Sequence, residues 1–278
     1  MTSPKTLFIT GVSSGFGRAI ARAALSACHQ VVGTVRTEVA RLEFEALSPG
    51  RAHGRLLDVS RFETIAPLAR DIEAAIGPVD VVINNAGYGH EGILEESPLE
   101  EMRRQFDVNV FGPVAVIKAF LPFLRSRRRG HVVNITSMGG TITMPGIAYY
   151  CGSKFALEGI SDALGKELKD LGIAVTAVAP GSFRTDWAGR SMVRSPRGIP
   201  DYDAVFDPVR QARLDRSGRQ PGDPDRAGRA IVDLLEMPEP PAHLLLGSDA
   251  LALVRAKLDQ MRADIDRHEA LTRSTDAA

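Results

Sequence analysis

The stretch Thr-Gly-Val-Ser-Ser-Gly-Phe-Gly at residues 10–17 decides the fold of this chain. It follows the apolar run Leu7–Thr10 and leads into a helix-length segment, Gly17–Ala27. Glycines at a strand-to-helix turn allow a tight backbone and the close approach of a ligand. The free amides and positive dipole end of the following helix suit a pyrophosphate. The Gly-x-x-x-Gly-x-Gly spacing differs from the more common Gly-x-Gly-x-x-Gly pattern, so a glycine-rich turn without a ligand stays an alternative here.

The alternation of strand and helix that starts at this turn continues along the chain. Short runs rich in Val and Ile, several of them apolar on consecutive residues, predict strands buried on both faces. They are Leu7–Thr10, Val31–Val35, Arg55–Leu57, Val79–Ile83, His131–Thr136, Ile173–Ala179 and His243–Leu246. Helix-length segments between them include Gly17–Ala27, Arg61–Ile76, Pro98–Arg125 and Ser153–Leu171. This order predicts an α/β fold with a parallel sheet covered by helices on both faces.

Two regions depart from this rhythm. Residues 181–225 are rich in Gly, Pro and Arg and too long for an ordinary connection, so we predict a substrate loop or lid there. Residues 248–273 predict an amphipathic C-terminal helix, with Leu251, Val254, Leu258 and Met261 at helical spacing. We interpret residues 1–278 as a single domain that contains both regions.

Charge and composition exclude several classes of protein. The chain has 278 residues, with 34 basic and 34 acidic side chains, so it carries no electrostatic footprint for a nucleic acid. At 44% hydrophobic and 24% charged residues it has an ordinary globular composition. Its two cysteines allow at most one bridge, so a reducing, cytoplasmic location is the default expectation.

The chain shows no signal for a membrane. Its start, Met1–Thr6, lacks the basic and apolar regions of a signal peptide. The most apolar long stretch, Val108–Leu124, contains Lys118 and two prolines, so it predicts a buried helix and not a bilayer span.

The ends of the second and third predicted strands bear on cofactor choice. Arg36 follows Val35, where an acid would bind the ribose hydroxyls of NAD, and an arginine suits the 2′-phosphate of NADP. We therefore prefer NADP over NAD, with a plain surface arginine as the alternative. Asp58 follows the third strand, where its carboxylate could accept a hydrogen bond from an adenine amino group or cap the helix Arg61–Ile76.

The strongest chemical signal is the set Ser137, Tyr150 and Lys154. A helix would place Tyr150 and Lys154 on one face, since they are four residues apart. A lysine ammonium near a phenol favours the phenolate, so we predict that Lys154 lowers the pKa of Tyr150 for proton exchange with a substrate oxygen. Ser137 ends the fifth strand, where ligands collect in open α/β sheets, and would hydrogen-bond the same oxygen. The Tyr-x-x-x-Lys pair alone is weak, and it gains weight from its place after the other motifs.

A further motif, Asn84-Asn85-Ala86-Gly87, follows the fourth strand. Its small residues would let a cofactor lie against the strand end, and asparagine side chains can tie adjacent loops together. Taken in order, these motifs resemble the short-chain dehydrogenase/reductase family. Thr10–Gly17 matches its glycine motif, Asn84–Gly87 its Asn-Asn-Ala-Gly motif, and Ser137, Tyr150 and Lys154 its catalytic set.

The resemblance implies more than the residues alone. It implies a Rossmann-type, doubly wound domain with a seven-stranded parallel sheet of order 3-2-1-4-5-6-7. It implies a fourth catalytic residue, Asn109, that holds a water linking Lys154 to solvent, and a nicotinamide-binding segment at Pro180-Gly181 and Thr185. It also implies pairing of long helices into a homodimer or homotetramer. The full set of cofactor-binding residues expected on this basis is Gly11, Ser13, Ser14, Gly15, Phe16, Gly17, Arg36, Asp58, Val59, Asn85, Ala86, Gly87, Tyr150, Lys154, Pro180, Gly181, Phe183 and Thr185.

Smaller signals are divided between function and packing. An apolar substrate pocket could be lined by Tyr88, His90, Met138, Met144, Phe183, Trp187 and Tyr202, each of them equally well explained by packing. Cys151 has no histidine spaced to activate it, so we expect a buried structural thiol and not a nucleophile. The histidines show no metal-ligand spacing, so we expect no metal site.

These observations predict an NADPH-preferring enzyme that interconverts a carbonyl and an alcohol on a small, apolar substrate. The first alternative is an NAD-dependent alcohol dehydrogenase of the hydroxysteroid- or retinol-like kind. The second is a regulatory protein that binds a dinucleotide without catalysis.

Overall fold

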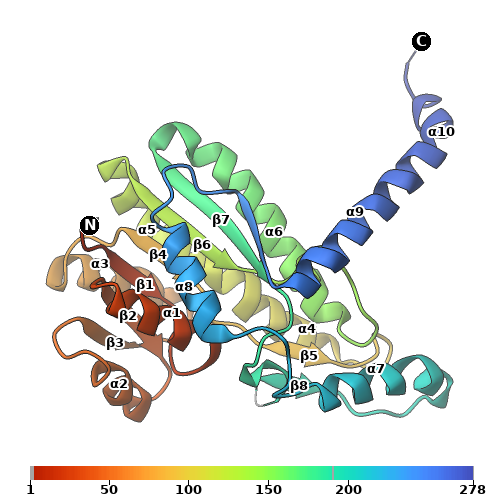
Figure 1. Cartoon of the computed structure of the whole chain (residues 1–278), viewed down its shortest axis with the longest axis horizontal. Helices are drawn as coiled ribbons and strands as arrows, with labels where there is room; N and C mark the ends of the chain where they lie inside the picture. Colours follow the sequence, from red (N-terminus) through yellow and green to blue (C-terminus); the bar gives the residue numbers. More distant parts are fainter. Residues whose placement is uncertain (1–2, 190, 278) are drawn as a thin grey trace.

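The computed structural model describes residues 3–189 and 191–277, and its main feature is one sheet of seven parallel strands (Figure 1). The strand order is β3-β2-β1-β4-β6-β7-β9. The strands are β1 (Thr6–Ile9), β2 (Gln30–Val35), β3 (Ala52–Leu56), β4 (Val81–Asn84), β6 (Gly130–Ile135), β7 (Ile173–Pro180) and β9 (His243–Leu246). With the two short strands β5 and β8 left out of the count, this is the predicted order 3-2-1-4-5-6-7. The prediction of a doubly wound, seven-stranded α/β fold is confirmed.

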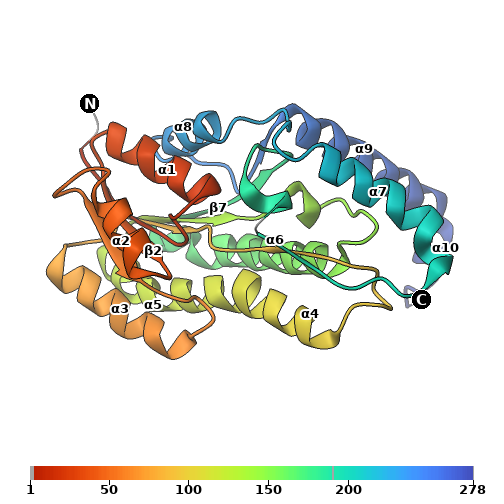
Figure 2. The same cartoon turned by 90° about the horizontal axis from the view of Figure 1, so that it is seen from below.

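Helices cover both faces of this sheet. Figure 2 shows α1 and α8 on one side of the sheet and α3, α5 and α6 on the other. The larger helices are α1 (Gly15–Ser26), α2 (Glu38–Glu45), α3 (Phe62–Ala75), α4 (Leu99–Phe106), α5 (Gly112–Arg127), α6 (Ala148–Leu168), α7 (Asp203–Asp215), α8 (Pro224–Leu234) and α9 (Ser248–Arg267). The short helix α10 (Glu269–Arg273) follows α9.

Alternating side chains of the strands build a core on each face. Leu7 and Ile9 of β1 pack in the cluster that includes Ile20 of α1 and Ile231 of α8. Phe8, between them, points to the other face and packs against Phe120 of α5, with ring centroids 4.6 Å apart and the rings tilted by 42°. Burial on both faces explains why β1 is apolar on consecutive residues.

The predicted helix Pro98–Arg125 is a continuous helical segment with a local distortion. The π-helical turn η1 (Asp107–Phe111) joins α4 to α5, and such turns are frequent at functional sites. The whole segment, Leu99–Arg127, is the part of the described chain whose length and apolar composition would allow a bilayer span. Val116, Phe120 and Leu124 of α5 are nevertheless packed in the core, as the buried-helix interpretation predicts.

The segment 181–225 has more structure than a loop. It contains a 3₁₀ turn (Asp186–Ala188), strand β8 (Met192–Arg194), a second 3₁₀ turn (Pro200–Tyr202) and helix α7, and it ends in the first residues of α8. Strand β8 pairs in parallel with β5 (Gly89–Glu91), which lies just after the Asn-Asn-Ala-Gly motif. The segment therefore has secondary structure of its own, and its role as a substrate loop or lid stays a prediction.

The C-terminal helix is present but is divided in two at His268, where α9 ends and α10 begins. Of its predicted apolar stripe, Val254 is buried, whereas Leu251, Leu258 and Met261 are exposed. Figure 1 shows the reason, because α9 leaves the body of the molecule after its first turns.

Candidate active site

Gly11 and Gly17, in the turn between β1 and α1, occupy positions that do not suit larger residues. Gly11 has φ +74°, in the left-handed region that favours glycine. A Cβ on Gly17 would collide with the Gly11 carbonyl oxygen and the Asn85 side-chain amide. Gly17 therefore serves the packing of the turn, and it does not line the cleft described below.

Thr10 and Asn85 fasten the end of β1 to the end of β4. The Asn85 side-chain amide donates to the carbonyl oxygens of Thr10 (2.8 Å) and Gly11 (3.0 Å). The Thr10 hydroxyl accepts from the backbone amides of Asn85 and Ala86, each at 2.9 Å. The tie between adjacent loops that the sequence suggested for the asparagines is present.

A cleft of about 1270 Å³ runs along the carboxyl ends of the parallel strands. Residues that follow six of the seven strands line it, as expected for ligand sites in open α/β sheets. The predicted cofactor residues that line it are Gly11, Ser13, Ser14, Gly15, Phe16, Arg36, Asp58, Val59, Asn85, Ala86, Gly87, Tyr150, Lys154, Pro180, Gly181, Phe183 and Thr185. The structure thus brings together every predicted cofactor residue except Gly17.

The cleft fits a dinucleotide in both size and chemistry. Its volume exceeds that of an ordinary small-molecule pocket, which leaves room for a cofactor and a substrate together. Helix α1 opens onto it at Gly15, and the Ser14 side chain makes no cap hydrogen bond, so the first amides of the helix are available to an anion. Three buried polar atoms of cleft residues lack a partner within the described chain: Trp187 Nε1, Gln220 Oε1 and Asp249 Oδ1.

Arg36 is exposed on the cleft wall at the end of β2. The next acid, Glu38, forms an ion pair with Arg41 within α2 and does not line the cleft. Asp58, across from Arg36 on the next strand end, accepts from the Ser60 amide (3.0 Å) and hydroxyl (2.7 Å) through Oδ1. Asp58 therefore orders the turn before α3 while it also lines the cleft.

Ser137, Tyr150 and Lys154 lie together on the wall of this cleft. Ser137 begins a 3₁₀ turn directly after β6, and its hydroxyl accepts from the Gly139 amide at 3.0 Å. Tyr150 and Lys154 are one turn apart on α6, with Lys154 Nζ 5.9 Å from the centre of the Tyr150 ring. A Cβ placed on Gly139 would lie 3.3 Å from both Ser137 Oγ and Tyr150 Cε1, so both side chains lie against Gly139.

Burial controls the protonation of this set. It raises the pKa of Tyr150 above its usual range, and the hydrogen bond with Ser137 acts in the opposite direction. It also lowers the pKa of Lys154 to about 8, against the attraction of Glu158. The predicted lowering of the Tyr150 pKa by Lys154 is therefore not found in the protein alone. The phenol is removed from water, and the lysine donates its hydrogen bond to the Ile135 carbonyl.

Asn109 lies in the π-helical turn, buried behind the cleft and not on its wall. Its side chain donates to the Tyr88 carbonyl oxygen and the Ser153 hydroxyl, each at 3.1 Å, and accepts from the Tyr88 amide at 3.2 Å. Ser153 in turn donates to the Tyr150 carbonyl oxygen at 2.7 Å. Asn109 thus anchors the helix that carries Tyr150, and its role in a water relay stays a prediction.

The suggested substrate-pocket residues divide into two groups. Tyr88, Met138, Met144, Phe183 and Trp187 line the cleft, and the Trp187 ring lies 4.9 Å from that of Tyr150. His90 and Tyr202 do not line it. His90 is buried with a 2.9 Å hydrogen bond to Ser195 Oγ and serves packing, whereas Tyr202 donates to Glu95 at 2.5 Å in an exposed contact.

The structure also reveals cleft residues that sequence reasoning missed. Asp249, at the start of α9, accepts from the Ser182 amide at 2.8 Å and lies against Gly181. Asp249 thus holds the predicted nicotinamide-binding segment although it lies 67 residues further along the chain. No local sequence pattern predicts a contact between residues so far apart. Arg213 of α7 and Arg216, which follows that helix, also line the cleft.

The described residues contain no group of three or more His, Cys, Asp or Glu side chains that could hold a metal ion. Cys28 and Cys151 are both free. Burial raises the pKa of the Cys151 thiol, which leaves it a poor nucleophile.

Three features occur together here: a parallel sheet with this strand order, a glycine turn at the first helix, and a Ser, Tyr and Lys set at one cleft. Together they define a dinucleotide-dependent oxidoreductase. A model of the family described as short chain dehydrogenase matches residues 5–193, and this chain belongs to the short-chain dehydrogenase/reductase family. It is an NAD(P)-dependent oxidoreductase that acts on CH–OH or C=O groups.

The matches to curated relatives cover most of this chain. The oxidoreductase BOA17 of Botryotinia fuckeliana is 35% identical over 89% of this chain and 90% of its own length. A 3-ketodihydrosphingosine reductase of Bacteroides thetaiotaomicron is 34% identical over 88% of each chain. An NADPH-dependent 3-dehydrocapnine reductase of Ornithobacterium rhinotracheale is 32% identical over 75% of each.

A solved structure matches the whole molecule. A short-chain dehydrogenase from Streptomyces avermitilis is 39% identical, and the match covers 100% of both chains with a TM-score of 0.92. The similarity therefore includes the segment 181–225 and the C-terminal helices.

Proposed function

We propose that this protein is an NADPH-preferring carbonyl reductase that acts on a small, predominantly apolar substrate. The observation that carries the proposal is one cleft with Ser137, Tyr150 and Lys154 on its wall and Arg36 at the end of β2. Chemistry and cofactor selection would then take place at two parts of the same cleft.

The chain's own residues supply binding and proton transfer. Bound nicotinamide supplies or accepts a hydride. The Tyr150 phenol donates a proton to the substrate carbonyl oxygen, and the Ser137 hydroxyl orients that oxygen by a hydrogen bond. Lys154 would bind the nicotinamide ribose and return a proton to Tyr150. The residues that would hold the cofactor are those of the glycine turn, the Asn-Asn-Ala-Gly motif and the segment from Pro180 to Thr185.

The pKa values support Tyr150 as the group that donates the proton. The raised pKa of Tyr150 keeps the phenol protonated at neutral pH, which is the form that donates to a carbonyl oxygen. The pKa of Lys154, about 8, lies close to neutrality and suits a group that passes a proton on.

Preference for NADPH rests on Arg36. Arg36 lines the cleft at the end of β2, and the next acid along the chain, Glu38, is paired with Arg41 and does not line it. A relative whose name states that it is NADPH-dependent supports the same choice. Calorimetry should show tighter binding of NADPH than of NADH, and the substitution R36A should remove most of the difference. Tighter binding of NADH by the wild type would favour the NAD-dependent alternative.

The substrate class is tested by a screen of NADPH consumption with aldehydes, ketones, steroids and quinones. Apolar cleft residues such as Met138, Met144 and Trp187 support a substrate with a substantial apolar part. Consumption of NADPH with at least one apolar carbonyl compound is the expected result. Tight cofactor binding with no turnover across the panel would favour the non-catalytic alternative.

We also propose a homodimer or homotetramer formed through the long helices. Exposed aromatic residues support this arrangement, since Phe111 at the end of η1 is 51% exposed and Phe155 on α6 is 42% exposed. Light scattering measures the mass in solution, and a monomer at micromolar concentration would contradict this part of the proposal.

A further inference from the structure

Helix α7 and the residue that caps its C-terminal end form one wall of the cleft, and the charged side chains on this wall are both basic. The residues that line the cleft here are Pro208, Val209, Ala212, Arg213 and the capping residue Arg216. Two guanidinium groups are thus set among apolar side chains. Arg213 is partly buried and Arg216 is exposed, and an anionic group on a substrate could pair with both, whereas a neutral, fully apolar substrate could not.

Arg213 is held in a fixed position by a buried carboxylate. Its Nη1 forms an ion pair with Oε2 of Glu91, a residue of β5 that is only 1% exposed. Its Nη2 also donates to the Pro145 carbonyl oxygen at 3.2 Å. Because the Arg213 side chain is only 12% exposed, it is ordered before any ligand binds.

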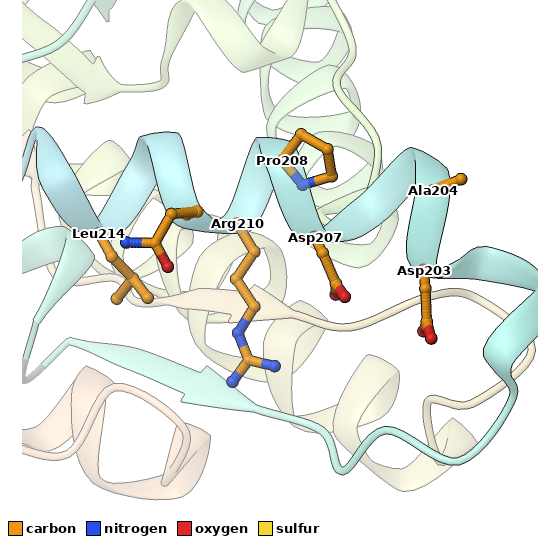
Figure 3. Close-up of a pocket in the computed structure, with 7 residues that line it drawn as sticks. Asp203, Ala204, Asp207, Pro208, Arg210 and Leu214 are labelled. Atoms are coloured by element: carbon orange, nitrogen blue, oxygen red, sulfur yellow. The ribbon is translucent and has the colours of Figure 1, made fainter.

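Glu91 does not balance the positive charge around it. Arg194 Nε lies 3.1 Å from Glu91 Oε1, and Arg210 Nε lies 3.3 Å from the same oxygen. With Arg213, three guanidinium groups share one carboxylate. Figure 3 shows Arg210 extending from α7 on the same side as Asp203 and Asp207, and Arg210 does not line the cleft.

Arg216 lies three residues after Arg213, directly after the last residue of α7, and it lines the same cleft. Among the described residues no carboxylate lies within 4 Å of its guanidinium group. The acidic side chains that line the cleft are on other elements: Asp58, Glu101, Asp107, Asp186 and Asp249. On the wall formed by α7 and Arg216, the charged side chains that line the cleft are therefore both basic.

We propose that Arg213 and Arg216 bind an anionic oxygen group, a carboxylate or a phosphate, carried by an otherwise apolar substrate. The inference rests on the proposed function, since it assigns the far end of the same carbonyl substrate. Guanidinium groups bind such anions through charge-assisted, often bidentate hydrogen bonds. Cleft residues such as Met138, Met144 and Val193 would contact the apolar part.

Ligand binding without turnover tests the inference. Decanoate, decyl phosphate and decanol share an apolar chain and differ in the end group. Calorimetry would compare their binding to the full-length protein in saturating NADPH, from which none of the three ligands can accept a hydride. The wild type should bind at least one of the two anions about tenfold more tightly than decanol, and their ratio distinguishes carboxylate from phosphate. R213Q and R216Q should each remove most of this preference.

R210Q is the matched control, because Arg210 contacts Glu91 as Arg213 does but does not line the cleft. It should keep the preference for the anion. R216Q leaves the ion pairs of Glu91 with Arg194, Arg210 and Arg213 intact. Its result therefore does not depend on the folding of the segment around β8. Equal binding of all three ligands by the wild type, or equal loss in R210Q and R213Q, would overturn the inference.

Failure of this inference is distinguishable from failure of the proposed function. Reduction of neutral ketones by a protein without anion preference would leave the reductase proposal standing and overturn only the role of the arginines. Anion preference in a protein that reduces no carbonyl compound would support the binding site and overturn the reductase proposal.

Discussion

The Lys154 ammonium group donates a 2.8 Å hydrogen bond to the carbonyl oxygen of Ile135, two residues before Ser137. This bond joins helix α6 to the end of β6, so the two elements that carry the predicted catalytic set are fixed to each other. It also places a cation in a nearly water-free position, since Lys154 is 6% exposed. The lowered pKa of Lys154 follows from that position.

Replacing Lys154 by methionine should change how stability depends on pH. The lysine keeps its proton up to a pKa of about 10.5 in the unfolded chain and about 8 in the folded one. The unfolded state therefore binds more protons between these values, and the wild type gains stability as pH rises. From pH 8 to about 9.5 this gain is about 2 kcal/mol, and K154M should lack it. Urea unfolding at several pH values measures the difference.

Lys166 provides the control, because it lies on the same helix with its side chain 75% exposed. K166M should leave the pH dependence of the wild type unchanged. If stability rises equally steeply with pH in K154M and in the wild type, burial does not lower the pKa of Lys154, and the prediction is wrong.

The substitution G17A should damage both the fold and cofactor binding. The added methyl group would collide with the Gly11 carbonyl oxygen and the Asn85 amide, which close the turn between β1 and α1. We expect a loss of about 2 kcal/mol in stability and strongly weakened NADP⁺ binding. Thermal unfolding and calorimetry measure the two effects.

Gly159 on α6 is the matched control, since nothing lies within 4 Å of a Cβ placed there. G159A should raise stability by about 0.5–1 kcal/mol, because alanine is the better helix former. A G17A protein with normal stability and cofactor affinity would refute the close approach described for this turn.

His131 should make the protein sensitive to acid. Burial lowers the pKa of His131 to about 4, and its Nε2 lies 2.9 Å from the Thr176 hydroxyl. The unfolded chain takes up the proton near pH 6.5, so stability falls as pH drops from about 6.5 to about 4, by about 3 kcal/mol in total. H131Q should flatten this fall, whereas H268Q, at an exposed histidine, should not. Parallel slopes in H131Q and the wild type would contradict the prediction.

The sequence predicted the large sheet because each of its strands is an apolar run that packs on two layers of helices. Strands β5 and β8 escaped prediction because each has three residues and is held by pairing with a distant partner. Helix α7 was hidden by Pro208 within it and by the Gly, Pro and Arg content of its surroundings. Tertiary packing outweighed local composition there.

The candidate site was largely predictable because strand ends converge in a parallel sheet, whatever lies between them in the chain. The pKa values of the site could not be predicted, since the pKa of Tyr150 depends on its burial, and the spacing of residues does not reveal burial. The pairing of Glu91 with Arg213 could not be predicted from the sequence either, because the two residues are 122 positions apart.

The central claim is that the Tyr150 hydroxyl transfers the proton, and the substitution Y150F tests it most directly. Phenylalanine keeps the ring that packs against Trp187 and removes only the hydroxyl. With a carbonyl substrate found in the screen, kcat should fall by a factor of about 100 or more, while NADPH affinity stays within about twofold of the wild type. Turnover that persists in Y150F near the wild-type rate would contradict the account.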